Sequence, residues 1–304
     1  METALDILRS LMFTPGQRQN MIDKALALGE ASPDAIMFDF EDSVPPDQKD
    51  LAREMVGSVL RRTFPANAPA LIVRVNSVAT GRQSADMRAV ISPNLFAVLL
   101  PKVERPEDVV AADAVLSLLE QEAGLPVGRI GLIAAIESAR AIHRVVDIAL
   151  STRRLKGLMF GAEDYARDLG LPVARTGPGW DLLFARSAII NAAAMASLFT
   201  MDQVHMNFKD QEAERSDAIA SRQLGFSGKC AIHPSQIPIL NSVFSPTIEE
   251  VEHARKVVVA FQEAAEAGVG CVMLGGQVVE QPILERAERV IQTQDAIERR
   301  TKAS

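Results

Sequence analysis

The sequence of residues 35–46 is AIMFDFEDSVPP, and this short segment holds the pattern that decides the fold. An apolar run, Ala35–Phe40, is interrupted only by Asp39 and passes directly into Glu41 and Asp42. Prolines at positions 45 and 46 then open a helical pattern that extends to about Arg62. Near-continuous apolar runs are typical of parallel strands covered on both faces, and proline is tolerated in the first helical turn. The segment therefore predicts one strand–helix unit with acidic residues at the junction.

The same unit recurs along the chain. The predicted strands are Ser10–Thr14, Ala35–Phe40, Ala70–Val75, Leu95–Leu100, Arg129–Ala135, Lys156–Phe160, Gln203–Met206 and Gly228–Ile232. Helical patterns follow over residues 17–28, 45–62, from about 83, 105–123, 139–149, 179–199, 210–224 and around 235–242. Eight such units in about 240 residues fit a closed (β/α)8 TIM barrel better than an open doubly wound sheet. We therefore predict an α/β fold with a barrel domain over residues 1–245.

The remaining residues, 246–304, predict a C-terminal helical extension rather than a ninth unit. Helical patterns cover Ile248–Ala267 and Pro282–Arg299. Between them, residues 271–280 have the pattern of a β-hairpin that turns at Gly275 and Gly276. The expected second domain is thus a helix–hairpin–helix extension.

Composition excludes several classes of protein. The chain has 304 residues, of which 48% are hydrophobic, and a net charge of -7, so it lacks the basic surface of a nucleic-acid binder. No apolar run approaches the ~20 residues that span a bilayer, and no signal peptide is evident. Two cysteines cannot build a disulfide framework, and four histidines argue against a multi-histidine metal centre. We expect a soluble, cytoplasmic protein with no membrane and no nucleic-acid partner.

Polar side chains follow most of the predicted strands, at the end where a barrel of this kind carries its active site. They are Asp39, Glu41 and Asp42, then Arg74 and Asn76, Lys102 and Glu104, Glu137 and Ser138, Glu163 and Asp164, and His233. Although they come from distant parts of the sequence, the carboxyl ends of parallel strands meet on one rim. We expect these side chains to converge there.

The predicted rim is rich in acids, and several carboxylates that crowd together repel one another unless a cation lies among them. Oxygen ligands favour Mg2+, with Mn2+ as the alternative. Glu137 and Asp164 are the best ligand pair because they end adjacent strands. The acids of the second strand, Asp39, Glu41 and Asp42, would then be outer partners of metal-bound water.

Arg74 lies inside a Val-Arg-Val strand, where a guanidinium is suited to bidentate capture of a substrate carboxylate. A structural interpretation stays open for two of these residues. Arg74 could pair with Asp42, which would leave no free charge for a substrate. Ser138 could simply cap the helix that begins at Ala139.

The motifs that carry these residues resemble a known family. They are RSLMFTPG at 9–16, FDFEDSV at 38–44, VRVN at 73–76, LPKVE at 100–104, IES at 136–138, FGAED at 160–164 and GKCAIHPSQ at 228–236. In this order they resemble the citrate lyase beta-subunit-like (CitE-like) family of the HpcH/HpaI aldolase/citrate lyase superfamily. The matches extend over nearly the whole chain, so the sequence is identified as a member of this family.

The resemblance implies a (β/α)8 barrel that binds Mg2+ and forms a homotrimer or a hexamer. Members make or break carbon–carbon bonds in acyl-CoA or acyl-carrier thioesters. Carried over by motif, Glu137 and Asp164 are the metal ligands and Arg74 holds the carboxylate of the keto acid. The backbone at Gly161 and Ala162 would contact the keto acid, and Phe13 and Arg18 lie in the motif near the thioester or CoA.

One position departs from the family. In its coenzyme-A lyases, an aspartate in a Val/Ile-Asp-x-Pro motif of the extension reaches a neighbouring subunit and acts as acid and base. The matching stretch here is VVEQP at 278–282, so Glu280 stands in that position. Its carboxylate is one methylene further from the backbone, which could move it by about an ångström. The alternative is that Glu280 is a solvated residue at the start of the last helix.

We therefore predict a Mg2+-dependent carbon–carbon lyase that cleaves or forms a 3-hydroxyacyl-CoA thioester. Substrates such as malyl-CoA or citramalyl-CoA would give a 2-keto acid and an acyl-CoA, with Arg74 and Glu280 as catalytic residues. Three alternatives stay open. They are a malyl-CoA thioesterase or malate synthase-type activity, a pyruvate-dependent aldolase, and a non-catalytic or carrier-dependent citrate lyase-like subunit.

Overall fold

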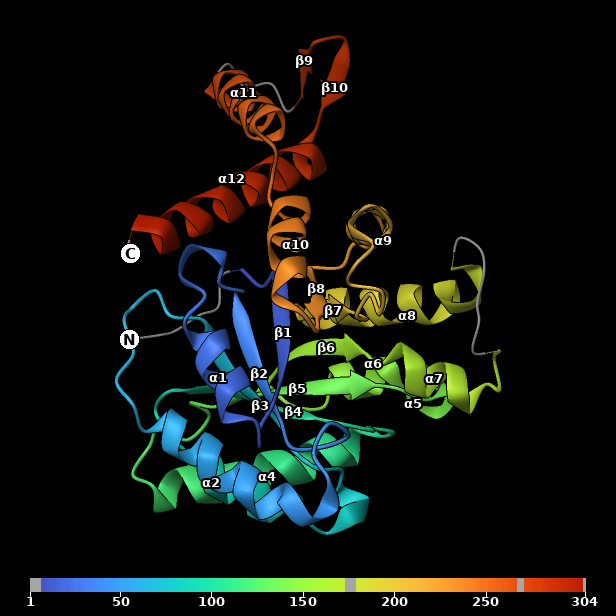
Figure 1. The fold of residues 1–304 in the computed structure, drawn as a ribbon. Coiled ribbons are helices and arrows are strands. Elements are labelled where there is room, and N and C mark those ends of the chain that lie inside the picture. Colours follow the sequence, from blue (N-terminus) through green and yellow to red (C-terminus); the bar gives the residue numbers. More distant parts are fainter. Residues whose placement is uncertain (1–6, 173–178, 267–270, 303–304) are drawn as a thin grey trace.

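A computed structural model describes residues 7–172, 179–266 and 271–302. Eight parallel strands form a closed barrel in which each strand pairs with the next and β8 pairs with β1 (Figure 1). The strands are β1 (Ser10–Pro15), β2 (Ala35–Asp39), β3 (Ala70–Arg74), β4 (Leu95–Leu100), β5 (Gly131–Ile136), β6 (Leu155–Phe160), β7 (Phe199–Asp202) and β8 (Gly228–Ala231). The predicted (β/α)8 barrel is therefore confirmed.

Helices surround the strands. They are α1 (Gln19–Leu26), α2 (Lys49–Leu60), α3 (Gln83–Val90), α4 (Pro106–Glu122), α5 (Ala139–His143), α6 (Val145–Ala149), α7 (Ala162–Asp168), α8 (Trp180–Ala196), α9 (Gln211–Leu224) and α10 (Ile237–Phe244). The start of α4 follows local rules: Pro106 occupies its first turn, and the Asp108 carboxylate accepts a hydrogen bond from the main-chain N–H of Arg105 at 3.2 Å.

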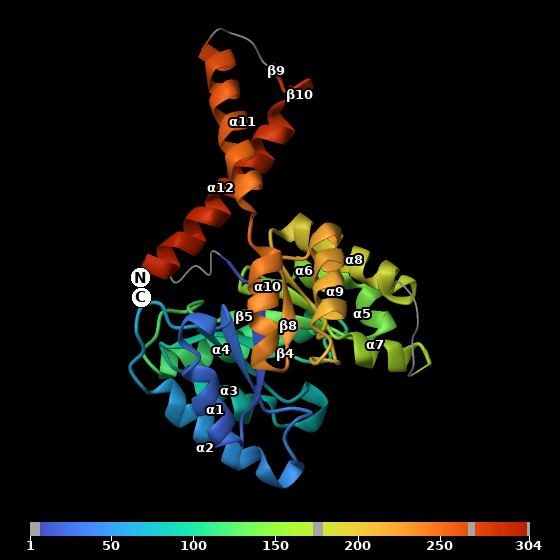
Figure 2. The ribbon, with the colours of Figure 1, turned by 45° about the horizontal axis from the view of Figure 1, so that its top comes forward.

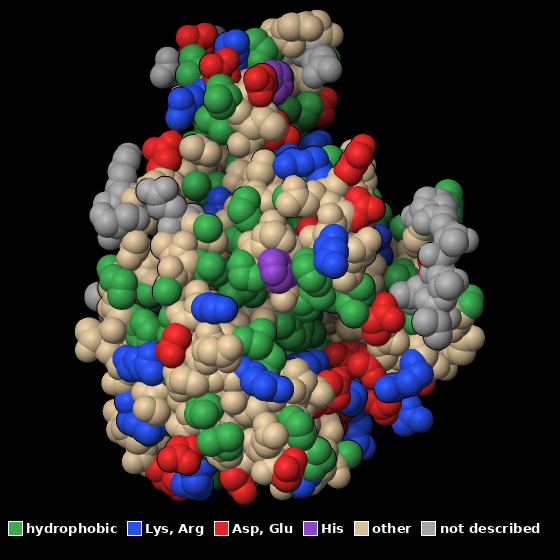
Figure 3. All heavy atoms as spheres, viewed as in Figure 1, with side chains coloured by type: hydrophobic (Ala, Val, Ile, Leu, Met, Phe, Trp, Pro, Cys, Tyr) green, Lys and Arg blue, Asp and Glu red, His purple; other side chains and the backbone are tan. Residues whose placement is uncertain are grey.

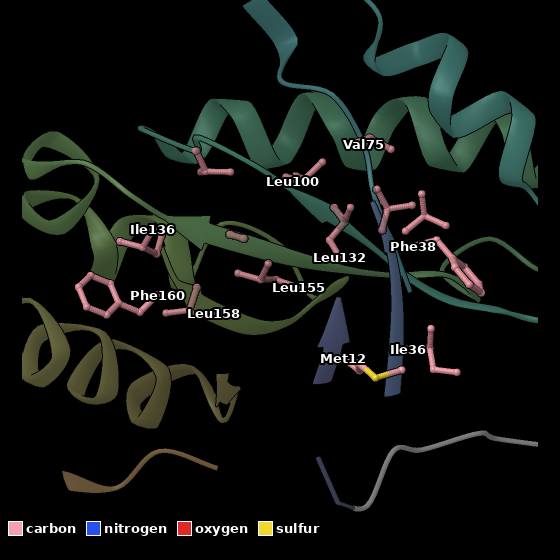
Figure 4. Close-up of a cluster of buried hydrophobic side chains, with 14 of the residues drawn as sticks. Met12, Ile36, Phe38, Val75, Leu100, Leu132, Ile136, Leu155, Leu158 and Phe160 are labelled. Atoms are coloured by element: carbon pink, nitrogen blue, oxygen red, sulfur yellow. The ribbon is translucent and has the colours of Figure 1, made fainter. Parts of the chain in front are cut away.

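Alternation along the strands divides the core into two layers. One cluster holds Leu11, Met37, Ile72, Ile133 and other strand residues with no residue of a helix, so it fills the inside of the barrel. The larger cluster takes the intervening strand positions together with the inner faces of the helices (Figure 4). Because side chains of a strand alternate between its two faces, each strand position is either inward or outward. This parity decides where every polar side chain of the strands points.

Three predicted elements differ from the structure. The seventh strand is Phe199–Asp202 and not Gln203–Met206, because Met201 pairs with Met159 of β6 and with Gly228 of β8. Helix α8 ends at Ala196, since Ser197 adopts a left-handed conformation with φ of 55°. The predicted helix 139–149 is divided at Arg144, and α7 was not predicted.

The C-terminal extension consists of α11 (Ile248–Glu266), β9 (Val272–Leu274), β10 (Gln277–Val279) and α12 (Gln281–Lys302). Ala267, where the prediction ended the first helix, lies outside the described residues. Figures 1 and 2 show that α11 and the hairpin project away from the barrel, whereas the end of α12 returns to it. There Arg300 Nη1 lies 2.9 Å from Asp34 Oδ1. In the described part of the chain, no helix combines the length and the apolarity that crossing a membrane requires.

Candidate active site

Asp39, Arg74 and Glu137, which were predicted on the rim, occupy inward positions at or directly after the carboxyl ends of their strands. Asp39 and Arg74 are the last residues of β2 and β3 and are direct neighbours in register. Glu137 follows β5 and Gly161 follows β6. Figure 3 shows Asp and Glu side chains gathered on the right of the view, with Lys and Arg beside them, where the arrows of β5 and β6 end in Figure 1. We call the carboxylates that follow β2, β5 and β6 the acid mouth; they are Asp39, Glu41, Asp42, Glu137 and Asp164.

Arg74 is held by the buried carboxylate of Asp39. Its Nε and Nη2 donate to the two Asp39 oxygens at 2.7 and 2.8 Å, whereas Asp42 is 3.9 Å from Nη1. The main partner of Arg74 is therefore Asp39, and not Asp42 as the structural interpretation suggested. Burial works against the charge of Asp39, but the hydrogen bonds and charge of Arg74 hold its pKa below the usual value. The Phe13 ring covers the guanidinium at 5.2 Å.

Glu41 lies beside this pair and is held from three directions. Arg74 Nη1 is 3.1 Å from its Oε2, and Lys102 Nζ donates to its Oε1 at 2.6 Å. Behind it, the buried Lys49 of α2 donates to the main-chain carbonyls of Phe40 and Glu41 at 2.6 and 2.7 Å. Despite these cations, burial raises the pKa of Glu41 above the ordinary value. The loop after β2 is thus fixed with its acid directed into the mouth.

Glu137 is a buried carboxylate that shares the mouth with other acids. The main-chain N–H of Lys102 donates to its Oε2 at 3.1 Å. A side chain at Gly161 would come within 2.3 Å of Glu137 Cγ, so glycine at this position makes room for Glu137. Burial, reinforced by the charges of Glu41 and Asp164, raises the pKa of Glu137 to about 7.

Asp164 lies in the first turn of α7, and Arg167 Nη2 contacts its Oδ1 at 2.6 Å. Glu137 and Asp164, whose charges interact, offer hard oxygen donors, and Glu137 is buried with a hydrogen bond from one neutral main-chain N–H. Within the described residues, no three acidic, histidine or cysteine side chains surround a common point. Mg2+ is commonly held by only one or two carboxylates, with water and substrate completing its shell, so this donor set fits it.

The other predicted site residues are placed as follows. Gly161 donates its N–H to Ile136 O at 3.1 Å, and Ala162 begins α7 as a buried residue. Arg18 is exposed before α1, and Glu280 is exposed just before α12 in the extension. Ser138 caps α5 by accepting a hydrogen bond from Ala141 N at 3.1 Å, as its structural interpretation proposed.

Sequence reasoning assigned no role to two lysines of this site. Lys102 was noted only as a strand-end residue, and Lys49 lies within a helical pattern that carries many charges. One feature of the sequence could have indicated a role for Lys102. It directly follows a predicted strand, in the motif LPKVE that also holds Glu104. No local pattern marks Lys49, because its partners are main-chain carbonyls.

Comparison with known proteins gives concordant matches. The sequence model of the HpcH/HpaI aldolase/citrate lyase family matches residues 9–234. Citrate lyase subunit beta of Escherichia coli K12 is 38% identical over 283 residues, which cover 93% of this chain and 92% of that protein. A (3S)-malyl-CoA thioesterase of Cereibacter sphaeroides is 34% identical and covers 95% of both chains. The crystal structure of CitE from Mycobacterium tuberculosis with magnesium, acetoacetate and coenzyme A superimposes with a TM-score of 0.75 at 27% identity, covering 96% of this chain and 99% of that one.

Proposed function

The chain belongs to the HpcH/HpaI aldolase/citrate lyase family, and from this premise we propose that it is a Mg2+-dependent carbon–carbon lyase of a 3-hydroxyacyl-CoA. The observation that carries the proposal is the acid mouth, where Glu137 and Asp164 lie beside a guanidinium fixed by Asp39. The match to a CitE structure that holds magnesium, acetoacetate and coenzyme A supports the same class of ligands. Malyl-CoA and citramalyl-CoA are the proposed substrates.

Glu137 and Asp164 would hold the divalent ion, and Mg2+ is the proposed cofactor, with Mn2+ as a substitute. When bound, the ion neutralises these carboxylates and polarises the oxygen atoms of the substrate. Asp39 and Glu41 keep Arg74 oriented, and Asp42 at the exposed edge contributes to the outer hydration of the site. Phe13 packs on Arg74 and excludes water from one side of it.

Arg74 would bind the carboxylate of the substrate with the N–H groups that neither Asp39 nor Glu41 occupies, and the backbone at Gly161 and Ala162 would lie against the keto-acid half. A base takes the proton of the 3-hydroxyl group, and the carbon–carbon bond then breaks to give a 2-keto acid and the enolate of the acyl-CoA. Protonation of that enolate completes the reaction. Fixed donors around the developing oxygen charge are the largest expected contribution to the rate.

Glu280 is the proposed base, supplied by a neighbouring subunit. Its carboxylate is exposed in an extension that projects from the barrel, which supports delivery to another copy of the chain (Figure 2). On the same ground we propose a homotrimer or hexamer in which residues 246–304 pack on the next barrel (residues 1–245), with Arg18 near the CoA.

Glu280→Asp should retain turnover within about tenfold, whereas Glu280→Gln should lose at least a hundredfold. Equal turnover of Glu280→Gln and the wild type would leave Glu280 as a solvated residue only.

The proposed function is tested by incubating the protein with malyl-CoA or citramalyl-CoA, with and without Mg2+, and identifying the products by mass spectrometry. A lyase gives acetyl-CoA together with glyoxylate or pyruvate, only when Mg2+ is present. Glu137→Gln and Asp164→Asn should each reduce this turnover at least a thousandfold. Full Mg2+-dependent turnover by Glu137→Gln would refute the ligand assignment.

A malyl-CoA thioesterase is the second candidate, and the 34% identity to such an enzyme over 95% of both chains supports it. The same assay separates the two activities. A thioesterase releases free malate and CoA, with no acetyl-CoA and no glyoxylate. A lack of any product with either substrate would favour an aldolase or a subunit that needs an acyl-carrier partner.

A further inference from the structure

We infer that Lys102 is a positioning residue that keeps Glu41 out of the inner coordination shell of the metal ion. The inference rests on the proposed function, because it concerns the ion that Glu137 and Asp164 would hold. It assigns to a lysine after β4 the task of limiting the site to two carboxylates, so that coordination positions remain for substrate and water.

The backbone of Lys102 indicates that its position is specified by the fold. With φ of 54°, it is one of two non-glycine residues with a left-handed backbone in the described chain. Such a conformation is strained for a residue that carries a Cβ, and residues of this kind cluster at functional sites. Here the turn directs the N–H of Lys102 to Glu137 Oε2 at 3.1 Å. A glycine would adopt this turn without strain, so the lysine side chain itself is the feature that needs a reason.

The side chain of Lys102 crosses the mouth to the loop after β2. Its Nζ lies 2.6 Å from Glu41 Oε1 and 3.4 Å from Asp42 Oδ1, and about a third of the side chain is exposed. Arg74 Nη1 takes the other oxygen of Glu41 at 3.1 Å. Both oxygens of this carboxylate therefore face cations of the protein itself, Oε1 through a hydrogen bond and Oε2 through an ion pair without hydrogen-bond geometry. Within the described residues, Glu137 forms no ion pair: its hydrogen bond comes from a neutral main-chain N–H, and Arg74 acts on it only through its charge.

This difference sorts the three interacting acids into two classes. Glu137 and Asp164 are proposed to hold the divalent ion, since the only side-chain cation on either in the described residues is Arg167, which is three quarters exposed and can move away from Asp164. Glu41 is instead held by Lys102 and by the buried Arg74. A third carboxylate in the inner shell would bind the ion more tightly, but it would occupy a position that a keto acid or hydroxyacyl group needs. By holding Glu41 away, Lys102 therefore lowers the affinity for the metal ion and leaves a coordination position open for the substrate.

The test uses Mn2+ as the probe and needs no substrate. Binding is followed by electron paramagnetic resonance of free Mn2+, and the number of exchanging inner-shell waters is obtained from water proton relaxation. In Lys102→Met, Glu41 is free to enter the shell, so the Mn2+ dissociation constant should fall about tenfold and about one exchanging water should be lost. Lys102→Arg should restore both values, and Lys24→Met, which changes an exposed lysine of α1, serves as the matched control.

Lys102→Gly separates the side chain from the turn, because glycine keeps the N–H to Glu137 and relieves the backbone. It should bind Mn2+ as Lys102→Met does. The double variant Lys102→Met with Glu41→Gln should return the hydration number to that of the wild type. In steady-state assays, the KM of the CoA thioester should rise in Lys102→Met more than kcat falls.

Weaker Mn2+ binding by Lys102→Met, or unchanged affinity and hydration, would overturn the inference while leaving the proposed function intact. Failure of the wild-type protein to bind Mn2+ at all would instead refute the proposed metal site. Circular dichroism of each variant establishes that it is folded before either result is interpreted.

Discussion

Two groups of buried charges lie on opposite faces of the same barrel wall. In the acid mouth, Asp39 occupies the inward position at the end of β2 beside Arg74 of β3, and Glu137 follows β5. A second group, the outer ion network (Arg186, Asp202, Asp217 and Lys229), uses outward positions of β7 and β8 and is covered by α8 and α9. Lys229 Nζ is 2.9 Å from Asp217 Oδ2 and 3.6 Å from Asp202 Oδ2, and Arg186 contacts Asp202 as well.

The two groups differ in charge balance. In the outer ion network two cations face two carboxylates, and although burial opposes it, the charges of Lys229 and Arg186 hold the pKa of Asp202 below its usual value. Glu214 adjoins them, and burial raises its pKa. The acid mouth has five carboxylates against Arg74, Lys102 and the exposed Arg167, while Lys49 beside them donates to main-chain carbonyls. Burial, reinforced by the neighbouring acids, raises the pKa of Glu137 to about 7. A balanced group contributes to stability by itself, whereas an unbalanced group is completed by an added cation.

The largest expected effect comes from breaking the balance of the outer ion network. Lys229→Met leaves Asp202 and Asp217 without their shared cation in a buried setting, so the free energy of unfolding should fall by about 3–5 kcal/mol. Urea denaturation followed by circular dichroism measures this free energy of unfolding. The control variant Lys24→Met should change it by less than about 0.5 kcal/mol. A loss as small as that of the control would mean that the network is not a stabilising element.

The next effect concerns Arg74, which should matter for turnover more than for stability. Arg74→Lys keeps the positive charge but cannot form the paired hydrogen bonds to Asp39 at 2.7 and 2.8 Å. We expect kcat/KM of the lyase assay to fall roughly a hundredfold, while the free energy of unfolding falls by about 1 kcal/mol. The opposite result, normal turnover with a large loss of stability, would place Arg74 among the structural ion pairs.

Alternation of strand faces explains what the sequence could and could not predict. The acid mouth was predictable because Asp39, Arg74 and Glu137 end correctly assigned strands. The same parity could have identified Asp39 as the partner of Arg74, since both side chains face inward in register. The outer ion network was not predictable, because Asp202 fell outside the predicted seventh strand. That error arose where the apolar helix α8 continues into β7 and only the left-handed Ser197 separates them.

A third prediction uses the pH dependence of the metal-free protein. The pKa of Glu137 is about 7 in the folded chain and near 4.5 when unfolded, so folding favours its protonated form. The stability from this group is complete below pH 4.5 and is lost as the pH rises through 7, by about 3 kcal/mol in all. Glu137→Gln should remove this decrease, and Mg2+ should restore the stability of the wild type at pH 8. Thermal unfolding between pH 5 and 8 measures both.

A wild-type protein whose stability does not fall over that range, relative to Glu137→Gln, would show that the mouth is already balanced without an ion. Asp202 of the outer ion network should show the opposite dependence on pH. The pKa of Asp202 is lowered, so its contribution is present above the unfolded value and is lost only at more acidic pH.

The smallest effect tests whether exposure, rather than position in the mouth, decides what an ion pair contributes. Arg167 contacts Asp164 at 2.6 Å, but three quarters of its side chain is exposed to water. Such pairs contribute about 0–1 kcal/mol, so Arg167→Ala should change the free energy of unfolding by less than about 0.5 kcal/mol. Because the variant leaves Asp164 without a competing cation, Mn2+ should bind the same or up to a few times more tightly. A stability loss comparable to that of Lys229→Met would contradict the distinction, because an exposed pair at the mouth would then stabilise the fold as much as a buried pair behind the barrel wall.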